Sequence, residues 1–238
     1  MKTALITGAS GGIGSAIAQR LAQEGFLPVL HYCSTSDGME EQAAKLGGFS
    51  VQADLSDVSA IEHMAQAVLD RTGRVDVLVN NAAVSVSGLL TDITPAQRRR
   101  LFEVNVLGAI ECTRVLLPQM VHRKNGCILN ISSMWGQVGA SCEVDYSASK
   151  AALIGFTKAL AQEVAPSGIR VNCIAPGVIR TKMLDCYDED TLQALADETP
   201  LGRLGTPEDI AAAAAFLCGG GAEFITGQVL GVNGGFVI

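Results

Sequence analysis

The stretch LITGASGGIG, residues 5–14, decides the fold of this chain. An apolar run leads into it and residues with helical spacing follow it, so we predict a strand, a tight turn and a helix. Glycines let the backbone turn sharply and approach a pyrophosphate, and a helix start offers free N–H groups to the anion. The spacing G-x-x-x-G-x-G therefore predicts a phosphate-binding turn. The expected contacts come from Gly8, Ser10, Gly12, Ile13 and Gly14.

Strand and helix patterns alternate outward from this turn to the end of the chain. Seven short runs, most of them apolar on both faces, are separated by stretches with apolar residues three or four positions apart, such as Ile13, Ile17 and Leu21. We expect strands at 2–7, 27–32, 49–53, 75–80, 127–131, 170–175 and 228–232. Repeated strand–helix units predict one α/β domain over residues 1–238. Its expected architecture is a Rossmann-type doubly wound sheet of about seven parallel strands with helices on both faces.

Composition and charge exclude several classes of protein. Hydrophobic residues make up 48% of the 238 residues and charged ones 17%, which argues against disorder. No run of about 18 apolar residues and no signal peptide is recognisable, so we expect a cytoplasmic protein without a membrane partner. The net charge of −7 argues against a nucleic-acid partner. The basic runs Arg98-Arg99-Arg100 and Arg123-Lys124 are expected to be solvated helix residues or subunit contacts.

Metal chemistry is not expected from the cysteines and histidines. The seven cysteines are at positions 33, 112, 127, 142, 173, 186 and 218. No pair is spaced C-x-x-C, and several fall in apolar runs that are typical of reduced, buried thiols. His31, His63 and His122 are the only histidines, and none lies within four residues of another. We therefore predict no metal site.

Residues 8–12 also match G-x-S-x-G, the nucleophile elbow of α/β-hydrolases. Ser10 would then be a nucleophile and would need a histidine base, which conventionally lies late in the chain. No histidine follows His122. We therefore favour a phosphate-binding turn over a serine hydrolase.

The ends of three further strands suit a dinucleotide. Asp54 and Leu55 follow the third strand, where a carboxylate can accept a hydrogen bond from an adenine amino group. Asn81 and Ala82 follow the fourth, where small residues let the backbone pass beside the cofactor. An acidic residue at the end of the second strand would hold the ribose 2′-hydroxyl of NAD and repel a 2′-phosphate.

The second strand instead ends in HYCSTS, residues 31–36, and the first carboxylate after it is Asp37. Hydroxyls and backbone amides here can bind a 2′-phosphate, so Tyr32 and Ser34 are expected to contact the cofactor. No arginine is present in this segment to add a positive charge. The segment thus favours NADP, with NAD as the less favoured alternative.

Tyr146 and Lys150 are expected on one face of a helix that begins near Asp145, because they are spaced i, i+4. A tyrosine with its ordinary pKa of about 10 is a poor acid at neutral pH. A neighbouring ammonium and an oxidised nicotinamide lower this pKa, so Tyr146 can protonate a carbonyl oxygen as hydride reaches the carbon. Ser133, at the end of the fifth strand, is expected to hydrogen-bond the same oxygen.

The chain resembles the short-chain dehydrogenases/reductases from end to end. The matching segments are TGASGGIG (7–14), NNAA (80–83), VNVLG (104–108), NISS (130–133), YSASK (146–150) and PG (176–177). The resemblance implies a catalytic tetrad of Asn105, Ser133, Tyr146 and Lys150. In this tetrad Asn105 helps to hold a water that links Lys150 to solvent. Contacts to the nicotinamide end of the cofactor are implied for Pro176, Gly177, Val178 and Thr181, and cofactor contacts also for Tyr146 and Lys150.

The resemblance also implies a moving region and an assembly. The region from Ile179 to about Arg203 is expected to close over substrate. Family members of this size are usually homotetramers. Their contacts are built on helices near 95–121 and 146–164 and on the C-terminal strand.

Within the family, the chain looks like the bacterial 3-oxoacyl-carrier-protein reductases of fatty acid biosynthesis. GRLG (202–205), PEDI (207–210) and ITGQ (225–228) fit them. Those reductases commonly carry arginine where this chain has Gly11. They dock an acidic carrier with basic residues beside the active site, and the two positions here are Lys124 and Ser167.

Where those reductases tend to have glutamine, this chain has Glu143. A carboxylate near the carbonyl pocket disfavours an acyl chain and attracts an amine. The segment SMWGQVGASCE, 133–143, resembles a subgroup that reduces the 5-aminopentanone group on a lysine of elongation factor P. Trp135 and Glu143 are therefore candidate substrate contacts. The alternatives are that Trp135 only packs and that Glu143 only stabilises a helix N-terminus.

We therefore predict NADPH-dependent reduction of a ketone to a secondary alcohol. The substrate is carried by acyl carrier protein or, alternatively, by elongation factor P. A non-catalytic NADP sensor on the same fold is the alternative from another class. Such sensors are expected to lose the tyrosine or the lysine, and this chain has both.

Overall fold

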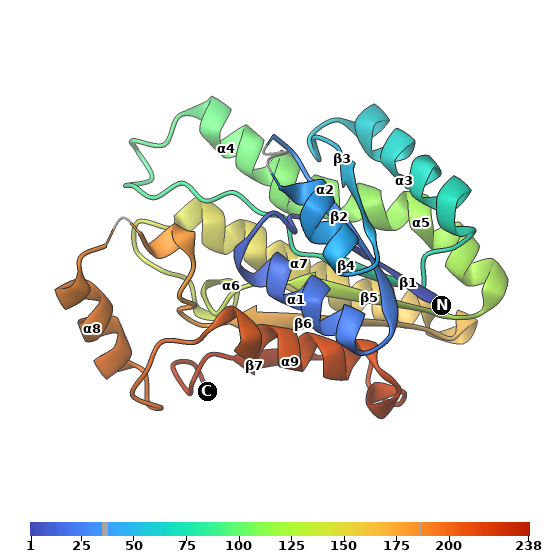
Figure 1. Cartoon of the computed structure of the whole chain (residues 1–238). Coiled ribbons are helices and arrows are strands. Elements are labelled where there is room, and N and C mark those ends of the chain that lie inside the picture. Colours follow the sequence, from blue (N-terminus) through green and yellow to red (C-terminus); the bar gives the residue numbers. More distant parts are fainter. Residues whose placement is uncertain (35–37, 186) are drawn as a thin grey trace.

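The computed structural model describes residues 1–34, 38–185 and 187–238 (Figure 1). Thr35, Ser36 and Asp37, which entered the argument for NADP, and Cys186 lie outside the described residues. Seven parallel strands form one sheet in the order β3-β2-β1-β4-β5-β6-β7. The strands are β1 (Lys2–Ile6), β2 (Phe26–Tyr32), β3 (Phe49–Gln52), β4 (Val77–Asn80), β5 (Gly126–Ile131), β6 (Ile169–Pro176) and β7 (Val229–Val232). The predicted doubly wound α/β sheet is confirmed, and each strand ends within two residues of its predicted bounds.

Helices cover both faces of the sheet (Figure 1). One face carries α1 (Gly12–Gln23), α2 (Met39–Lys45) and α9 (Pro207–Cys218). The other carries α3 (Val58–Thr72), α5 (Ala109–Arg123) and α7 (Val144–Val164). The shorter elements are α4 (Pro95–Phe102), the π-helical η1 (Glu103–Gly108), α6 (Trp135–Val138), η2 (Ala165–Ser167), η3 (Lys182–Leu184), α8 (Glu189–Glu198) and η4 (Gly220–Ala222).

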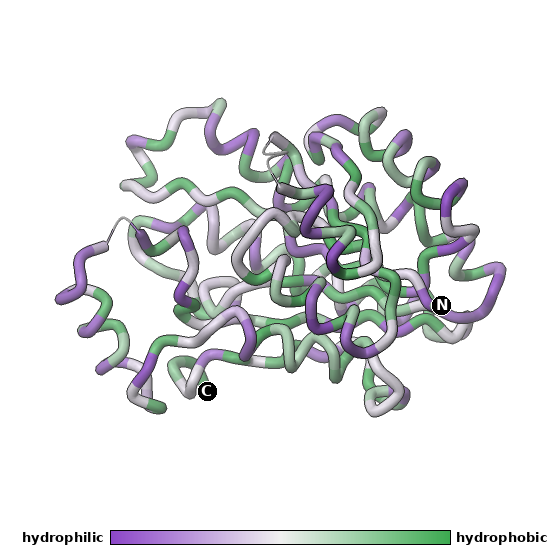
Figure 2. The backbone as a smooth tube through the Cα atoms, viewed as in Figure 1, coloured by the Kyte–Doolittle hydropathy of each residue, from purple (hydrophilic) through white to green (hydrophobic). Residues whose placement is uncertain are grey.

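The central strands are apolar on both faces because both faces are covered by helices. All residues of β4 and β5 are buried. In β1, Leu5 joins one apolar cluster and Ile6 the cluster on the opposite face. Burial of such a side chain contributes about 1.5–3 kcal/mol. Figure 2 shows the complementary pattern in the peripheral helices α3 and α8, where hydrophilic and hydrophobic residues alternate.

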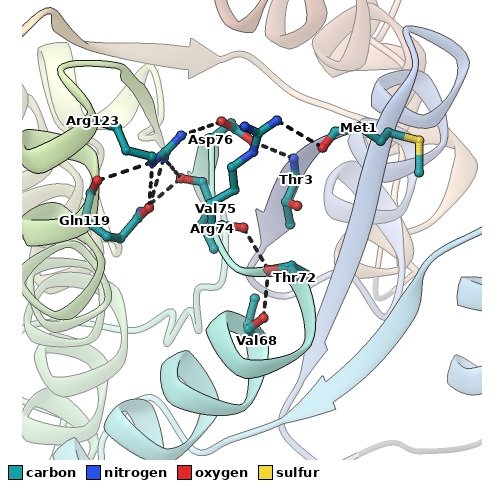
Figure 3. A network of polar contacts seen from close by, with 9 residues as sticks. All are labelled: Met1, Thr3, Val68, Thr72, Arg74, Val75, Asp76, Gln119 and Arg123. Atoms are coloured by element: carbon teal, nitrogen blue, oxygen red, sulfur yellow. Dashed lines mark hydrogen bonds and ion pairs between the residues drawn. The ribbon is translucent and has the colours of Figure 1, made fainter.

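Asp76, directly before β4, joins the amino ends of three strands to α5 (Figure 3). Its carboxylate accepts hydrogen bonds from the Thr3 backbone N–H at 2.8 Å and from Arg123 Nη1 at 2.7 Å. Arg74 Nε lies 3.1 Å from the same carboxylate, and the Cys127 N–H donates to the Asp76 carbonyl oxygen. Arg123 is therefore a structural residue with only 25% of its side chain exposed, so our expectation of a solvated side chain is corrected, and a subunit contact stays a prediction.

Two arginines of the other basic run, Arg98-Arg99-Arg100, also bind carboxylates within the chain. Arg98 Nε donates to both carboxylate oxygens of Asp145 at 2.9 Å, and Arg100 binds Asp54. Within this run only Arg99 is in the exposed class, as predicted. Arg98 and Arg100 also keep 39% and 42% of their side-chain surface exposed, so they are partly solvated, and a subunit contact stays a prediction. Their ion pairs were not predicted, because the carboxylates are 47 and 46 residues away in the sequence.

The described cysteines are all free thiols. Cys112, Cys127, Cys173 and Cys218 are buried, as we expect for apolar runs, whereas Cys33 and Cys142 are exposed. No group of three or more possible metal ligands occurs within residues 1–34, 38–185 and 187–238. In those same ranges no helix is both long and apolar enough to cross a membrane.

Candidate active site

The turn between β1 and α1 requires glycine at three positions. Gly8 and Gly12 have φ angles of +65° and +53°, a left-handed conformation that favours glycine. A β-carbon on Gly8 would lie 2.7 Å from the Ala82 Cα, and one on Gly14 would overlap the Gly8 carbonyl oxygen. Close backbone approach thus shapes this turn, as its sequence predicts.

The amino end of α1 is open to an anion. α3, α4, α8 and α9 each begin with an Asp or Thr side chain that accepts a backbone N–H, whereas Gly11 before α1 makes no such bond. A β-carbon on Gly11 would have nothing within 4 Å. Free N–H groups, the helix dipole and open space together fit the pyrophosphate of a dinucleotide.

The segment after β4 braces the glycine turn. Thr7 Oγ1 accepts hydrogen bonds from the backbone N–H groups of Asn81 at 2.9 Å and Ala82 at 3.0 Å. Asn81 Nδ2 donates to the carbonyl oxygens of Thr7 at 2.9 Å and Gly8 at 3.0 Å. Asn81 and Ala82 therefore lie at the turn, where we predicted them. Their direct contact with a cofactor stays a prediction.

His31, on β2, is a further brace that the sequence analysis missed. Its Nδ1 accepts from the Gly8 N–H, and its Nε2 lies 3.0 Å from the Ala53 carbonyl oxygen. These partners define a neutral ring that carries its proton on Nε2. Burial lowers the pKa of His31, although the bond to Ala53 and the charge of Asp54 oppose the shift. The polar residue in an otherwise apolar strand is the only sequence signal for this role.

Asp54 is already bound within the chain. Its two carboxylate oxygens accept from Arg100 Nη1 at 2.9 and 3.1 Å, and one also accepts from the Ser56 N–H and hydroxyl at 2.9 Å. Burial alone would raise the pKa of Asp54, but the hydrogen bonds from Arg100 and Ser56 outweigh it and lower the pKa. Leu55 beside it is buried. At the end of β2, Tyr32 is partly buried and Ser34 is exposed.

α7 and β5 bring Ser133, Tyr146 and Lys150 together. Lys150 Nζ lies 5.7 Å from the centre of the Tyr146 ring, and it donates to the Ile131 carbonyl oxygen at 2.8 Å. The lysine is only 2% exposed. Ser133 follows the end of β5 by two residues, and its hydroxyl accepts from the Trp135 N–H at 3.1 Å. The predicted proximity of these three side chains agrees with the structure, and their roles stay predictions.

Burial dominates the ionisation of Tyr146 and Lys150. Burial, with a smaller contribution from the Glu143 carboxylate, raises the pKa of Tyr146 to about 12, and Ser133 opposes the shift. Burial lowers the pKa of Lys150 to about 8. We expected the ammonium and a nicotinamide to lower the tyrosine pKa. In the chain alone the opposite holds, because desolvation of the phenolate is the larger effect.

Asn105 lies in the π-helical segment η1, which the sequence analysis did not predict. Its Nδ2 donates to the Val84 carbonyl oxygen at 2.9 Å and to Ser149 Oγ at 3.2 Å. Its Oδ1 accepts from the Val84 N–H at 2.8 Å. The amide thus fixes the segment after β4 against α7. Single π-turns are frequent at functional sites, and a role in a proton relay stays a prediction.

Glu143, at the start of α7, is tied to the segment after β4. Its carboxylate accepts from the Ser87 hydroxyl at 2.7 Å. Cys142 before it has a left-handed φ of 61°, and the Cys142 carbonyl accepts from the Gly88 N–H at 2.9 Å. The Glu143 side chain makes no capping hydrogen bond to α7. Its position, close enough to influence the Tyr146 pKa, is consistent with a substrate contact.

Trp135 packs its ring edge-to-face against Phe236, with ring centres 5.8 Å apart. The ring is only partly buried, and it begins the short helix α6 directly after Met134. Packing against the C-terminal segment is thus one function of this tryptophan. A contact with substrate stays a prediction.

The segment after β6 reaches the glycine turn. The Gly177 N–H donates to Val232, and a β-carbon on Gly177 would lie 2.7 Å from the Asn233 Cα. A β-carbon on Gly12 would lie 3.3 Å from Thr181 Cγ2. Pro176 and Val178 flank Gly177 at the end of β6. A hollow of about 300 Å³ is lined by Arg180, Thr181, Leu184, Asp185, Tyr187, Glu189 and Leu192. It falls within the region predicted to close over substrate.

The predicted carrier-docking position Lys124 lies elsewhere. It precedes β5, whereas Ser133 follows β5, so within one chain the two residues lie at opposite ends of the strand. Ser167 precedes β6 at the same end as Lys124. The expectation that both positions lie beside the active site is therefore wrong for a single chain.

Comparison with known proteins gives matches over almost the whole chain. The family model described as "Enoyl-(Acyl carrier protein) reductase" matches residues 8–237. The "Uncharacterized oxidoreductase YmfI" of Bacillus subtilis is 44% identical, over 99% of this chain and 98% of the relative. The "3-oxoacyl-[acyl-carrier-protein] reductase FabG" of Staphylococcus aureus is 38% identical, over 98% of this chain and 97% of the relative. The protein of the same name from Vibrio cholerae is also 38% identical, over 98% and 96%.

Proposed function

Because the chain belongs to the short-chain dehydrogenase/reductase family, and is thus an NAD(P)-dependent oxidoreductase, we propose that it reduces a ketone to a secondary alcohol with NADPH in the cytoplasm. The observation that carries the proposal is the cluster of Ser133, Tyr146 and buried Lys150 after β5. The carboxyl ends of parallel strands share one edge, so this cluster and the glycine turn after β1 border the same crevice.

Each side chain has a distinct part in the proposed reaction. Bound NADPH supplies the hydride. The Ser133 hydroxyl donates a hydrogen bond to the substrate carbonyl oxygen and stabilises its developing charge. Tyr146, protonated at neutral pH because burial raises its pKa to about 12, donates its phenolic proton to that oxygen. The Lys150 ammonium stabilises the phenolate that remains, and Asn105 is the proposed link to a water that returns the proton.

Substitution of Tyr146 and Lys150 tests the proposal. We expect Tyr146→Phe and Lys150→Met to lower kcat for a ketone by about 100-fold or more, the usual contribution of general acid catalysis. NADPH titration, followed by nicotinamide fluorescence, should show that Tyr146→Phe still binds the cofactor. Lys158→Met is a matched control, because Lys158 is an exposed lysine two turns further along α7.

The same experiment separates an enzyme from a sensor. Wild-type protein that binds NADPH but reduces no ketone would support a non-catalytic sensor. Full activity in Tyr146→Phe would instead contradict the assignment of Tyr146 as proton donor.

Two substrates follow from two different observations. The names of the relatives at 38% identity support a 3-oxoacyl group on acyl carrier protein. Glu143 supports a cationic ketone, such as the 5-aminopentanone group on elongation factor P, because its carboxylate lies near Tyr146 and is held by Ser87. A negative charge beside the carbonyl pocket attracts an ammonium group and disfavours an acyl chain.

Glu143→Gln distinguishes the two substrates. If the substrate is cationic, kcat/KM for an amino-ketone should fall about tenfold more than kcat/KM for an acetoacetyl thioester, since a charge-assisted contact is lost. Glu163→Gln, an exposed glutamate on the same helix, is the control. Equal effects on both substrates would contradict the cationic pocket. Loss of the Glu143 charge should also lower the Tyr146 pKa. Reduction requires protonated Tyr146, so the fall in activity with rising pH should begin at a lower pH in Glu143→Gln than in the wild type.

We also propose a homotetramer. Leu107 and Val121 expose 53% and 40% of their surface along the helical segment that the resemblance assigns to assembly. Leu230 on the edge strand β7 is 37% exposed, and Phe216 and Phe224 nearby in the chain are more exposed still. Exposed apolar groups of this size are typical of interfaces. Light scattering after size exclusion should give four times the 24.8 kDa chain mass.

A further inference from the structure

An arginine reaches the end of β2, although no arginine is near it in the sequence. β2 and β3 are parallel neighbours with Tyr32 opposite Gln52. The next residues stay adjacent, since the Ala53 N–H donates to the Tyr32 carbonyl at 3.1 Å and Gln52 Nε2 to the Cys33 carbonyl at 2.8 Å. Asp54 and Ser34 therefore emerge side by side.

Arg100 crosses from the end of α4 to this point. Its Nη1 donates to Asp54 at 2.9 and 3.1 Å and also contacts the Ser56 hydroxyl. Its Nε and Nη2 donate to no oxygen of the described residues, and the Cys33 thiol at the end of β2 is a further hydrogen-bond partner of the guanidinium. The Arg100 side chain keeps 42% of its surface exposed to solvent. The pKa of Arg100 is raised by Asp54, with a smaller contribution from Cys33 at the end of β2.

The end of the second strand is where dinucleotide-binding folds distinguish a 2′-phosphate from a 2′-hydroxyl, and a nearby arginine accommodates the phosphate. A guanidinium can donate two parallel hydrogen bonds to phosphate oxygens. A half-exposed Asp54 would otherwise repel that phosphate. Arg100 neutralises this carboxylate, while its Nε and Nη2 donate to no oxygen of the described residues.

We propose that Arg100 selects NADPH over NADH by donating from Nε and Nη2 to the 2′-phosphate while Nη1 stays on Asp54. Asp54 is then the positioning residue for the guanidinium. This inference rests on the proposed use of NADPH, and it supplies the positive charge that residues 31–36 lack.

Arg100→Gln tests this proposal, with Arg99→Gln as the matched control. Arg99 is the adjacent residue of α4 and is exposed, and its side chain has no hydrogen-bond partner in the part of the chain that the structure describes. Binding of NADPH and NADH is measured by nicotinamide fluorescence. Binding of adenosine 2′,5′-bisphosphate and of 5′-AMP is measured by calorimetry. Thermal unfolding without ligand reports whether each variant folds.

The expected result is a loss of discrimination. Arg100→Gln should weaken NADPH and adenosine 2′,5′-bisphosphate by about tenfold or more, because two charge-assisted bonds are lost. NADH and 5′-AMP should change by less than about twofold, and Arg99→Gln should change nothing. Arg100→Lys should keep part of the preference, since lysine offers the charge without the planar fork.

Three results would overturn the proposal, and they differ in what else they overturn. If Arg100→Gln keeps the wild-type preference for NADPH over NADH, Arg100 does not bind the 2′-phosphate, although the proposed use of NADPH stands. If 5′-AMP weakens as much as the bisphosphate, Arg100 only supports the adenine end of the site. If the wild-type protein binds NADPH no better than NADH, the proposed cofactor fails together with the role of Arg100.

Discussion

Two aspartate–arginine pairs each join a strand end to a helix, at opposite ends of the same sheet. Asp76 precedes β4 and binds Arg123 of α5, whereas Asp54 follows β3 and binds Arg100 of α4. The Asp76 and Arg123 side chains are 6% and 25% exposed. Those of Asp54 and Arg100 are 44% and 42% exposed.

The difference in burial indicates that these two aspartate–arginine pairs serve different purposes, one in stability and the other in binding. At the amino end, the Asp76 carboxylate is enclosed by Thr3, Arg74 and Arg123, so every partner is part of the protein (Figure 3). At the carboxyl end, Arg100 Nε and Nη2 donate to no oxygen of the described residues, and the pair is about half exposed. A closed network contributes to stability, because removal of one member leaves a buried group unpaired. An open pair contributes little to stability and leaves binding capacity for a ligand.

The largest effect is expected from Asp76→Ala. This substitution leaves the Thr3 N–H and Arg123 Nη1 without their acceptor at a buried site, although Arg123 Nη2 keeps the Val75 carbonyl. We expect the free energy of unfolding to fall by about 3–5 kcal/mol, the range for breaking a buried pair. Urea unfolding at neutral pH measures this loss. NADPH affinity of the protein that remains folded should not change.

The matched control for Asp76 is a pair with similar chemistry but no burial. Glu62 and Arg114 lie 2.7 Å apart, with side chains 53% and 54% exposed. Glu62→Ala should cost less than about 1 kcal/mol. Equal losses in Asp76→Ala and Glu62→Ala would contradict the view that burial decides what such a pair contributes.

The sequence predicts the glycine turn and the candidate catalytic cluster much better than it predicts either of these ion pairs. The glycine turn and the Tyr146–Lys150 spacing are local patterns, and they place the sheet, the crevice and the candidate catalytic cluster. Arg100 and Arg123 are read from the sequence only as a basic surface, because their partners lie 46 and 47 residues away. The Tyr146 pKa also escapes prediction, since it depends on burial by residues that only the fold brings together.

A smaller effect is expected from His31, which lies at the carboxyl end but is as buried as Asp76. His31→Phe leaves the Gly8 N–H and the Ala53 carbonyl unpaired, so we expect a loss of about 1–3 kcal/mol. Because burial lowers the folded-state pKa of His31 below 6.5, the unfolded chain takes up a proton first as the pH falls. Its stabilising contribution is thus complete above pH 6.5 and declines below it.

Unfolding curves at several pH values test this signature. The difference in stability between wild-type protein and His31→Phe should be largest near pH 7.5 and should narrow below about pH 6. His63→Gln, at an exposed histidine of α3, should show no such narrowing. A constant difference across this pH range would mean that His31 does not titrate on unfolding, and that packing alone explains its contribution.

The smallest effect on stability is expected from Arg100→Gln. The pair it breaks is exposed on both sides, so the loss in urea unfolding should stay below about 1 kcal/mol and shrink further at high salt, where surface charges are screened. Asp54 stays solvated when its partner is removed, unlike Asp76, and needs no compensating group. Urea unfolding and cofactor titration should be measured on both variants, because each variant is expected to change only one of the two quantities, stability or cofactor preference. Asp76→Ala should lower stability without changing the preference for NADPH, whereas Arg100→Gln should change the preference without lowering stability. If the free energy of unfolding fell as much in Arg100→Gln as in Asp76→Ala, the Asp54–Arg100 pair would be a structural ion pair like the one at the amino end.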